Sequence, residues 1–324
     1  MLFRSTIDAY HDHGYNLLTT LASSVPLTIG SVMPAENYET VNSFGLEFAT
    51  GWSDRIGKNI DYNIGAFLAW SANKNVFVDV ATTNRGSWLD PTGRSSDRGL
   101  QGYRYLGMFR SQEEVDRYLE KNPDYTIMGY APKPGMLYYQ DIRGPRQTDG
   151  TYAAPDGKIT EDDQEYLTRK ENNHYTFGLS FGFGFKGFKV DVVTAGSFGG
   201  QGIVDGDARK KAAKDVSRPV FWADHYTPEN PNAKYPDPYW EETYTMVSSF
   251  WFRNAFAFNM RSLNVSYQLS QNLAKKLGIS SAKIIGVGLN PITFFNPYDY
   301  KAASGAYNVY PQMRTWSLGL NLTL

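Results

Sequence analysis

Residues 175–193 read YTFGLSFGFGFKGFKVDVV, and this stretch decides the fold. Large apolar residues alternate with Gly, Ser and Thr up to Phe185, and the alternation resumes at Phe188. A period of two places the two kinds of side chain on opposite faces of a β-strand. The Lys186–Gly187 pair between the two runs is typical of a tight hairpin. The stretch therefore predicts two long antiparallel strands.

The same alternation recurs along the chain. Further runs cover residues 3–10, 44–52, 60–70, 263–269, 285–289 and 316–324, which brings the expected strands to eight. Many of the runs have the length of a transmembrane β-strand, about 9 to 11 residues, whereas strands of soluble proteins average about 5 to 6. Their polar faces carry Gly, Ser and Asn more than Lys and Glu. We therefore predict an all-β fold, an antiparallel transmembrane β-barrel, in preference to a soluble β-sandwich.

Composition excludes several classes of protein. The 324 residues include 32 Lys and Arg against 33 Asp and Glu, so a nucleic-acid partner is not expected. The absence of Cys removes disulfides, thiolate metal sites and a Cys nucleophile. A mean hydropathy of −0.45 excludes a polytopic helical membrane protein. The first residues lack the basic and apolar regions of a signal peptide. The uncharged stretch 13–35 contains Pro26, and we interpret it as a loop.

The links between the expected strands alternate in length. Links 53–59, 186–187 and 270–281 are short, whereas links 14–40, 71–171, 199–254 and 291–312 are long. Outer-membrane barrels have short periplasmic turns and long extracellular loops. The four long links are therefore predicted to be extracellular, and the C-terminus periplasmic.

The end of the chain points to a family. Four stretches carry this signal: MRSLNVSYQLS (260–270), LAKKLGIS (273–280), VGLNP (287–291) and YPQMRTWSLGLNLTL (310–324). They resemble the SusC/RagA-type TonB-dependent outer-membrane transporters. Two earlier stretches, NSFGLEF (42–48) and FRSQEEV (109–115), also resemble that family.

This resemblance implies a larger assembly. The family's barrel has about 22 strands, and a plug and a TonB box precede it. Neither is found before Phe3, so residues 1–324 correspond to the last eight strands. The implied location is the outer membrane of a Gram-negative, Bacteroidetes-like bacterium.

The resemblance also implies a function, the active import of an oligosaccharide or oligopeptide. The implied partners are a SusD-like surface lipoprotein, the remaining N-terminal barrel and plug portion, TonB acting through that portion, and membrane lipid, including lipopolysaccharide. The alternative is a self-contained small outer-membrane barrel acting as an adhesin or binding module.

Two short motifs invite an enzymatic interpretation. Residues 178–182 match the nucleophile elbow G-x-S-x-G, and residues 182–187 match G-x-G-x-x-G. Both patterns require a helix directly after a turn, whereas here both lie in the alternating runs and their hairpin. With four His and no Ser–His–Asp set in view, we do not expect an enzyme.

The metal candidates are weak. Residues 156–163, DGKITEDD, resemble the second half of an EF-hand loop, with Asp156 and Asp163 as calcium candidates. The earlier ligand positions would fall on Tyr152 and Ala154, so a solvated acidic turn is favoured and no cofactor is expected. His11 and His13 share a strand face without a third ligand, which favours a simple strand-end pair.

The long links are rich in aromatic residues. Flat rings next to Asp and Asn suit sugar faces or peptide side chains, although any single ring also suits packing between loops. Our candidates for contact with a ligand or partner are Trp88, Tyr103, Tyr105, Trp222, Tyr239 and Trp240. Residues 111–121 predict a short helix, with Ser111 as its N-cap and Glu114 at the third position.

Overall fold

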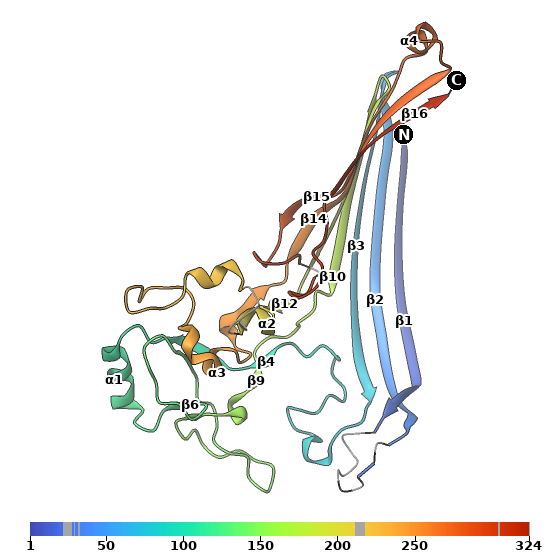
Figure 1. Cartoon of the computed structure of the whole chain (residues 1–324). Helices are drawn as coiled ribbons and strands as arrows, with labels where there is room; N and C mark the ends of the chain where they lie inside the picture. Colours follow the sequence, from blue (N-terminus) through green and yellow to red (C-terminus); the bar gives the residue numbers. More distant parts are fainter. Residues whose placement is uncertain (22–27, 29, 32, 211–217, 304, 324) are drawn as a thin grey trace.

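The computed structural model describes the chain except residues 22–27, 29, 32, 211–217, 304 and 324. Its main feature is one eight-stranded antiparallel sheet in which the strands follow chain order (Figure 1). The strands are β1 (Leu2–Thr20), β2 (Ala35–Ile56), β3 (Ile60–Phe77), β10 (Tyr175–Phe185), β11 (Phe188–Phe198), β14 (Ala257–Gln268), β15 (Ser281–Phe295) and β16 (Thr315–Thr323). All eight expected strands are therefore present, and Leu324 lies outside the described residues.

Several strands extend into segments expected to be loops. β1 continues to Thr20 and β2 begins at Ala35, so strand structure enters the expected loop 14–40 from both ends. The expectation that 13–35 is entirely loop is wrong for residues 13–20, because backbone pairing continues through a bulge where Asn16 has a φ of 52°. Pro26 lies outside the described residues. β3 likewise continues to Phe77, and β15 passes Pro291 at a register shift that tolerates a missing N–H.

One face of the sheet is apolar and exposed. Ile7 in β1 and Leu318 in β16 are 76% and 84% exposed. Aromatic rings pair across neighbouring strands at two levels of this face: Phe3 with Trp52, at 6.0 Å between centroids, and Phe44 with Trp70, at 5.8 Å. An apolar surface that runs across a whole sheet must meet another apolar phase. We call it the apolar face.

The opposite, polar face carries small residues under large rings. A Cβ atom on Gly178 would lie 2.2 Å from the ring of Phe67 on the neighbouring strand, and one on Gly45 would lie 2.6 Å from the ring of Tyr10. The rings can lie flat against the backbone only because glycine has no side chain there. Larger residues at Gly178 or Gly45 would push the rings off the sheet.

The short links are tight turns. Lys186 and Gly187 have φ of 45° and 88°, which gives the β10–β11 hairpin two positive φ values, as a type I′ turn requires. The interpretation of residues 178–187 as strand and hairpin is confirmed, since Ser180 lies in the middle of β10. α4 (Gln271–Lys276) occupies the β14–β15 link. Both termini lie at the α4 end of the sheet (Figure 1).

The other elements gather at the opposite end of the sheet (Figure 1). They include four two-stranded sheets: β4 (Gln101–Gly102) with β9 (Glu165–Tyr166), β5 (Tyr105–Met108) with β7 (Leu137–Tyr139), β6 (Thr126–Ile127) with β8 (Lys158–Ile159), and β12 (Gln201–Ile203) with β13 (Phe252–Asn254). The helices there are α1 (Gln112–Lys121), α2 (Gly206–Arg209) and α3 (Glu241–Tyr244), with 3-10 turns η2 (Thr82–Asn84), η3 (Glu161–Asp163), η4 (Val220–Ala223), η5 (Pro238–Trp240) and η6 (Ser249–Trp251). Across the described residues, no helix has the length and apolarity needed to cross a membrane.

Candidate functional site

Residues 78–174 and the described residues of 199–256, which are 199–210 and 218–256, fold together around one hydrophobic core, and we call them the loop unit. The fully buried rings of Trp251, Tyr139 and Tyr244 lie at its centre, with Phe109, Met136 and Leu137 also fully buried. Tyr300 and Tyr307 from the β15–β16 link pack against the same core. Three of the four long links therefore form a compact body with its own water-excluded interior.

A bridging hydroxyl ties two parts of this core together. The Tyr125 hydroxyl donates to the backbone oxygen of Tyr139 at 2.7 Å and accepts from the Tyr139 amide at 2.9 Å. In the β5–β7 ladder the amide of Gln140 donates to the oxygen of Arg104. Tyr139 faces Tyr105 as a non-hydrogen-bonded pair, so its own polar groups point away from β5. Burial raises the pKa of Tyr125, which keeps the hydroxyl protonated.

α1 begins as the sequence predicts. The Ser111 hydroxyl accepts from the Glu114 amide at 3.3 Å, and the Glu114 carboxylate accepts from the Arg110 amide at 2.6 Å. The first interaction satisfies an N–H group that the helix start leaves without a partner, and the second fixes the residue before the N-cap against the first turn. Val115 is the buried residue of the helix, which attaches α1 to the core of the loop unit.

The six aromatic candidates are not in one place. Tyr103 and Trp222 are 3% and 4% exposed and belong to the core, where the Trp222 indole donates to the Ala208 oxygen at 2.8 Å. Tyr105 packs edge-on against Phe250.

The other three candidates are nearer the surface. Trp88 lies edge-on to Tyr166, beneath the guanidinium of Arg143. Tyr239 is 71% exposed, and its ring lies 4.8 Å from that of the partly exposed Trp240. Of the six, the Tyr239–Trp240 pair is the one that presents rings at the surface.

The carboxylates of the calcium candidates serve the backbone. Asp163 is buried and accepts from the amides of Ile142 at 3.0 Å and Thr160 at 2.8 Å. Asp156 accepts from the Lys158 amide within its own turn. Within the described ranges, no group of three or more His, Cys, Asp or Glu side chains could hold a metal ion. Asp156 and Asp163 thus stabilise a turn, and His13 of the other candidate pair hydrogen-bonds to Asn42.

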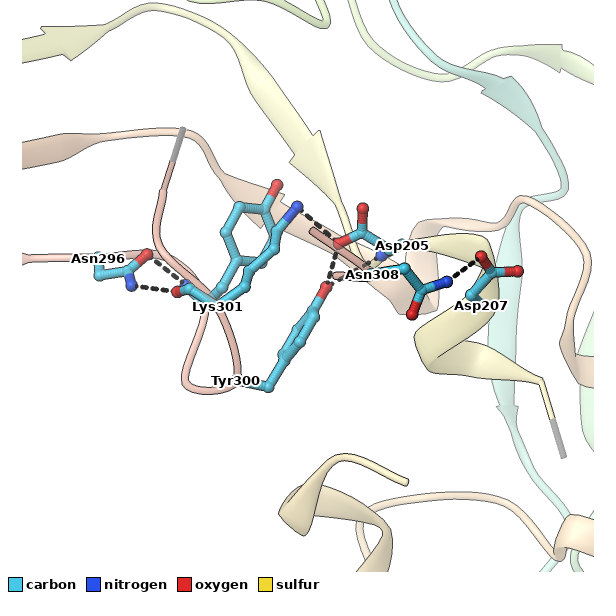
Figure 2. Close-up of polar contacts among 7 residues, drawn as sticks. Asp205, Asp207, Asn296, Tyr300, Lys301 and Asn308 are labelled. Atoms are coloured by element: carbon cyan, nitrogen blue, oxygen red, sulfur yellow. Dashed lines mark hydrogen bonds and ion pairs between the residues drawn. The ribbon is translucent and has the colours of Figure 1, made fainter. Parts of the chain in front are cut away.

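A polar cluster joins the β15–β16 link to the loop unit (Figure 2). The Asp205 carboxylate accepts from the Tyr300 hydroxyl at 2.8 Å and pairs with the Lys301 ammonium at 2.5 Å. Asn308 donates to Asp207, two residues further along the chain. Burial raises the pKa of Tyr300, and the nearby carboxylate of Asp205 also raises it. The Asp205–Lys301 pair is largely shielded from water, which makes this contact, here named the latch, stronger than a surface ion pair.

The latch forms one side of a polar pocket of about 530 Å³. Tyr298 and Lys301 line it from the β15–β16 link, and the polar faces of β10, β11 and β14 line it from the sheet through Thr176, Ser197 and Asn259. Further lining side chains include Glu171 and Arg261. The pocket thus lies where the sheet meets the loops, and its volume is within the range of small-ligand sites.

Comparison with known proteins gives the architecture a context. No family model matches the sequence. A TonB-dependent receptor of Formosa agariphila is 21% identical over 320 residues, which cover 89% of this chain and 29% of the receptor. Structures of the RagAB peptide transporter, and of the RagAB peptide importer in its closed-closed and open-open states, share the fold with TM-scores of 0.68, 0.70 and 0.69. The resemblance to SusC/RagA-type TonB-dependent transporters is confirmed.

The RagA-type likeness covers part of a longer protein. Identity to the RagAB structures is 14–15%, so it establishes the fold. The match covers 99% of this chain and 33% of theirs. The chain therefore spans about a third of the length of the proteins it matches.

Sequence reasoning missed the polar residues of this chain that gather around Asp205. Asp205 and Tyr300 are 95 positions apart in two different links. Neither belongs to a periodic run, and no spacing rule connects them. The aromatic content of the links was the available signal, and it led to rings that mostly build the core.

Proposed function

We propose that this chain forms the C-terminal barrel wall and much of the extracellular mouth of a TonB-dependent outer-membrane importer. The substrate is an oligosaccharide or an oligopeptide, and the transporter works with a SusD-like surface lipoprotein. One observation carries the proposal: a single open sheet with an exposed apolar face bears its compact loop unit at one end only. A wall in lipid with a recognition body on one side is the form that import across an outer membrane needs.

The sheet edges support a larger barrel. In the described part of the chain, β1 and β16 form the two edges of the sheet. Unpaired backbone groups do not persist in lipid, so we expect both edges to pair with strands of an N-terminal portion that also carries the plug through which TonB acts. Residues 1–324 expressed alone and refolded in detergent should aggregate. A monodisperse, heat-modifiable monomer would instead support the self-contained small barrel.

The loop unit supplies the surface for recognition. Tyr239 and Trp240 present their rings next to each other at this surface, and we propose them as contacts for the substrate or the lipoprotein. The buried candidates Tyr103 and Trp222 would hold this surface in shape. The apolar face would contact membrane lipid, including lipopolysaccharide, and the C-terminus would be periplasmic. Catalysis has no part in this proposal.

Uptake by the native bacterium tests the proposed function. Cells with and without the gene for this protein are supplied with a panel of oligosaccharides and oligopeptides, and the loss of each compound from the medium is measured. Depletion of one class should stop both in the deletion strain and in a strain without TonB. Depletion that depends on this protein but continues without TonB would contradict active import.

A further inference from the structure

Two opposite charges in the polar pocket have no partner among the described residues. The carboxylate of Glu171 and the guanidinium of Arg261 both line it, and no described residue forms a hydrogen bond or ion pair with either side chain. In the same pocket, Lys301 and Asp205 neutralise each other. Asp205 and Lys301, which hold the wall of the pocket in place, are therefore paired with each other. Glu171 and Arg261 are available to pair with a ligand.

A third polar group, in the wall of the pocket, also lacks a partner among the described residues. The side-chain oxygen of Asn259 is buried and receives no hydrogen bond from the described residues. A buried acceptor of this kind is costly unless a ligand or ordered water supplies a donor. Burial and the nearby charge of Asp97 raise the pKa of Glu171, so Glu171 also gains from a positively charged group brought into the pocket.

The chemistry of the occupant follows from the two charges. A neutral oligosaccharide would displace water from Glu171 and Arg261 without supplying an opposite charge. Removing charged groups from water without pairing them is unfavourable. A peptide offers an ammonium, a carboxylate and amide donors together. An arginine guanidinium suits a carboxylate because it presents two parallel N–H donors.

We propose that the pocket binds an oligopeptide through its charged groups, with Arg261 receiving a carboxylate and Glu171 an ammonium. The inference rests on the proposed import function and narrows its substrate class. The latch is the pre-organising element, because it holds Lys301, whose ammonium lies over the Tyr298 ring, in place against the loop unit before a ligand enters.

The test uses the complete transporter purified in detergent together with its lipoprotein partner. Binding of three probes is measured by calorimetry: penta-alanine with free ends, penta-alanine acetylated and amidated at its ends, and maltopentaose. Penta-alanine with free ends should bind at least about tenfold more tightly than the capped peptide, because each lost charge-assisted hydrogen bond is worth about a factor of ten. Maltopentaose should not compete with it.

Substitutions assign the effect to the pocket. Arg261→Gln and Glu171→Gln should each weaken binding of the free-ended peptide about five- to tenfold and leave the capped peptide nearly unchanged. Arg4→Gln and Glu47→Gln are the matched controls, because both residues lie on the polar face of β1 and β2 outside the pocket. These controls should bind like the wild type.

Two results would overturn the inference: equal affinity for free and capped peptides, or binding of the free-ended peptide that neither Arg261→Gln nor Glu171→Gln changes. TonB-dependent depletion of oligosaccharides alone, with maltopentaose bound by the purified complex, would also overturn it and leave the proposed import function standing. Uptake that is independent of TonB would reject the function and leave the binding result to be judged separately.

Discussion

Replacing Tyr125 with Phe should loosen the loop unit without affecting the sheet. The substitution removes one oxygen and leaves the ring, so the packing of the core changes little. It leaves both backbone groups of Tyr139 without a partner, since they point away from β5 and have the Tyr125 hydroxyl as their partner at 2.7 and 2.9 Å. An unsatisfied buried polar group costs about 1 to 3 kcal/mol. Taking the lower part of that range, about 1 to 1.5 kcal/mol for each group, the two together should lower the stability of the loop unit by about 2 to 3 kcal/mol.

Amide hydrogen exchange on the complete transporter measures this change. Local opening that is easier by about 2 to 3 kcal/mol accelerates exchange by about 30- to 150-fold. The acceleration should appear at β7 and at α1, whose last turn lies next to Tyr125, and should be absent from β10. Tyr239→Phe is the control, because it removes a hydroxyl from a ring that is mostly in solvent. Unchanged exchange at β7 in Tyr125→Phe would refute the bridging role of the hydroxyl.

The remaining predictions concern orientation, insertion and pH. Cys at Tyr239 should react with an impermeant maleimide on whole cells and Cys at Lys186 should not; the reverse pattern would refute the topology. Leu320→Asp should lower the amount of protein in the outer membrane, because it places a charge on the apolar face at a cost below the about 2 to 4 kcal/mol of a mid-membrane Arg or Lys; Asn321→Asp, on the other face, should not, and equal membrane levels would contradict the assignment. Burial raises the pKa of Asp141, and neighbouring carboxylates also raise it. The charged form of Asp141 therefore destabilises the loop unit at pH values above that pKa. Asp141→Asn should therefore stabilise the unit by less than about 1 kcal/mol at pH 7, and the gain in thermal unfolding should vanish near pH 4; a gain that persists there would have another cause.

The strands were predictable because the alternation within each strand shows which of its two faces is apolar. Leu179 and Phe181 alternate with small residues whatever the rest of the chain does, and a period of two needs no distant contact to be recognised. The N-cap of α1 was predictable for the same reason, since Ser111 and Glu114 are three residues apart. The ends of the long strands were not, because residues such as Thr20 and Phe77 are held in strand conformation by pairing with their neighbours.

The candidate site was less predictable because it depends on distant contacts. Whether a ring such as Trp222 faces solvent or the core is decided by segments far away in the sequence. The latch and the pocket it borders likewise bring together residues of separate links. That the links are the place of recognition therefore stays a prediction from the sequence, which gave no sign of the polar residues that shape the pocket.

The two levels of paired rings mark the two boundaries of the apolar zone of the sheet. On β2 they lie at Trp52 and Phe44, eight residues apart, which is about 27 Å along a strand and close to the apolar height of an outer-membrane barrel, about 25 Å. The next row outward on the same face is polar, with His13 opposite Asn42 and Asn42 opposite Lys74. We therefore expect the ends of β1, β2 and β3 next to the loop unit to lie in water, outside the membrane. Charged substitutions at these strand ends should be tolerated, as on the surface of a soluble protein. The same charges a few residues closer to the α4 end of the strand, on the apolar face, should hinder insertion into the membrane.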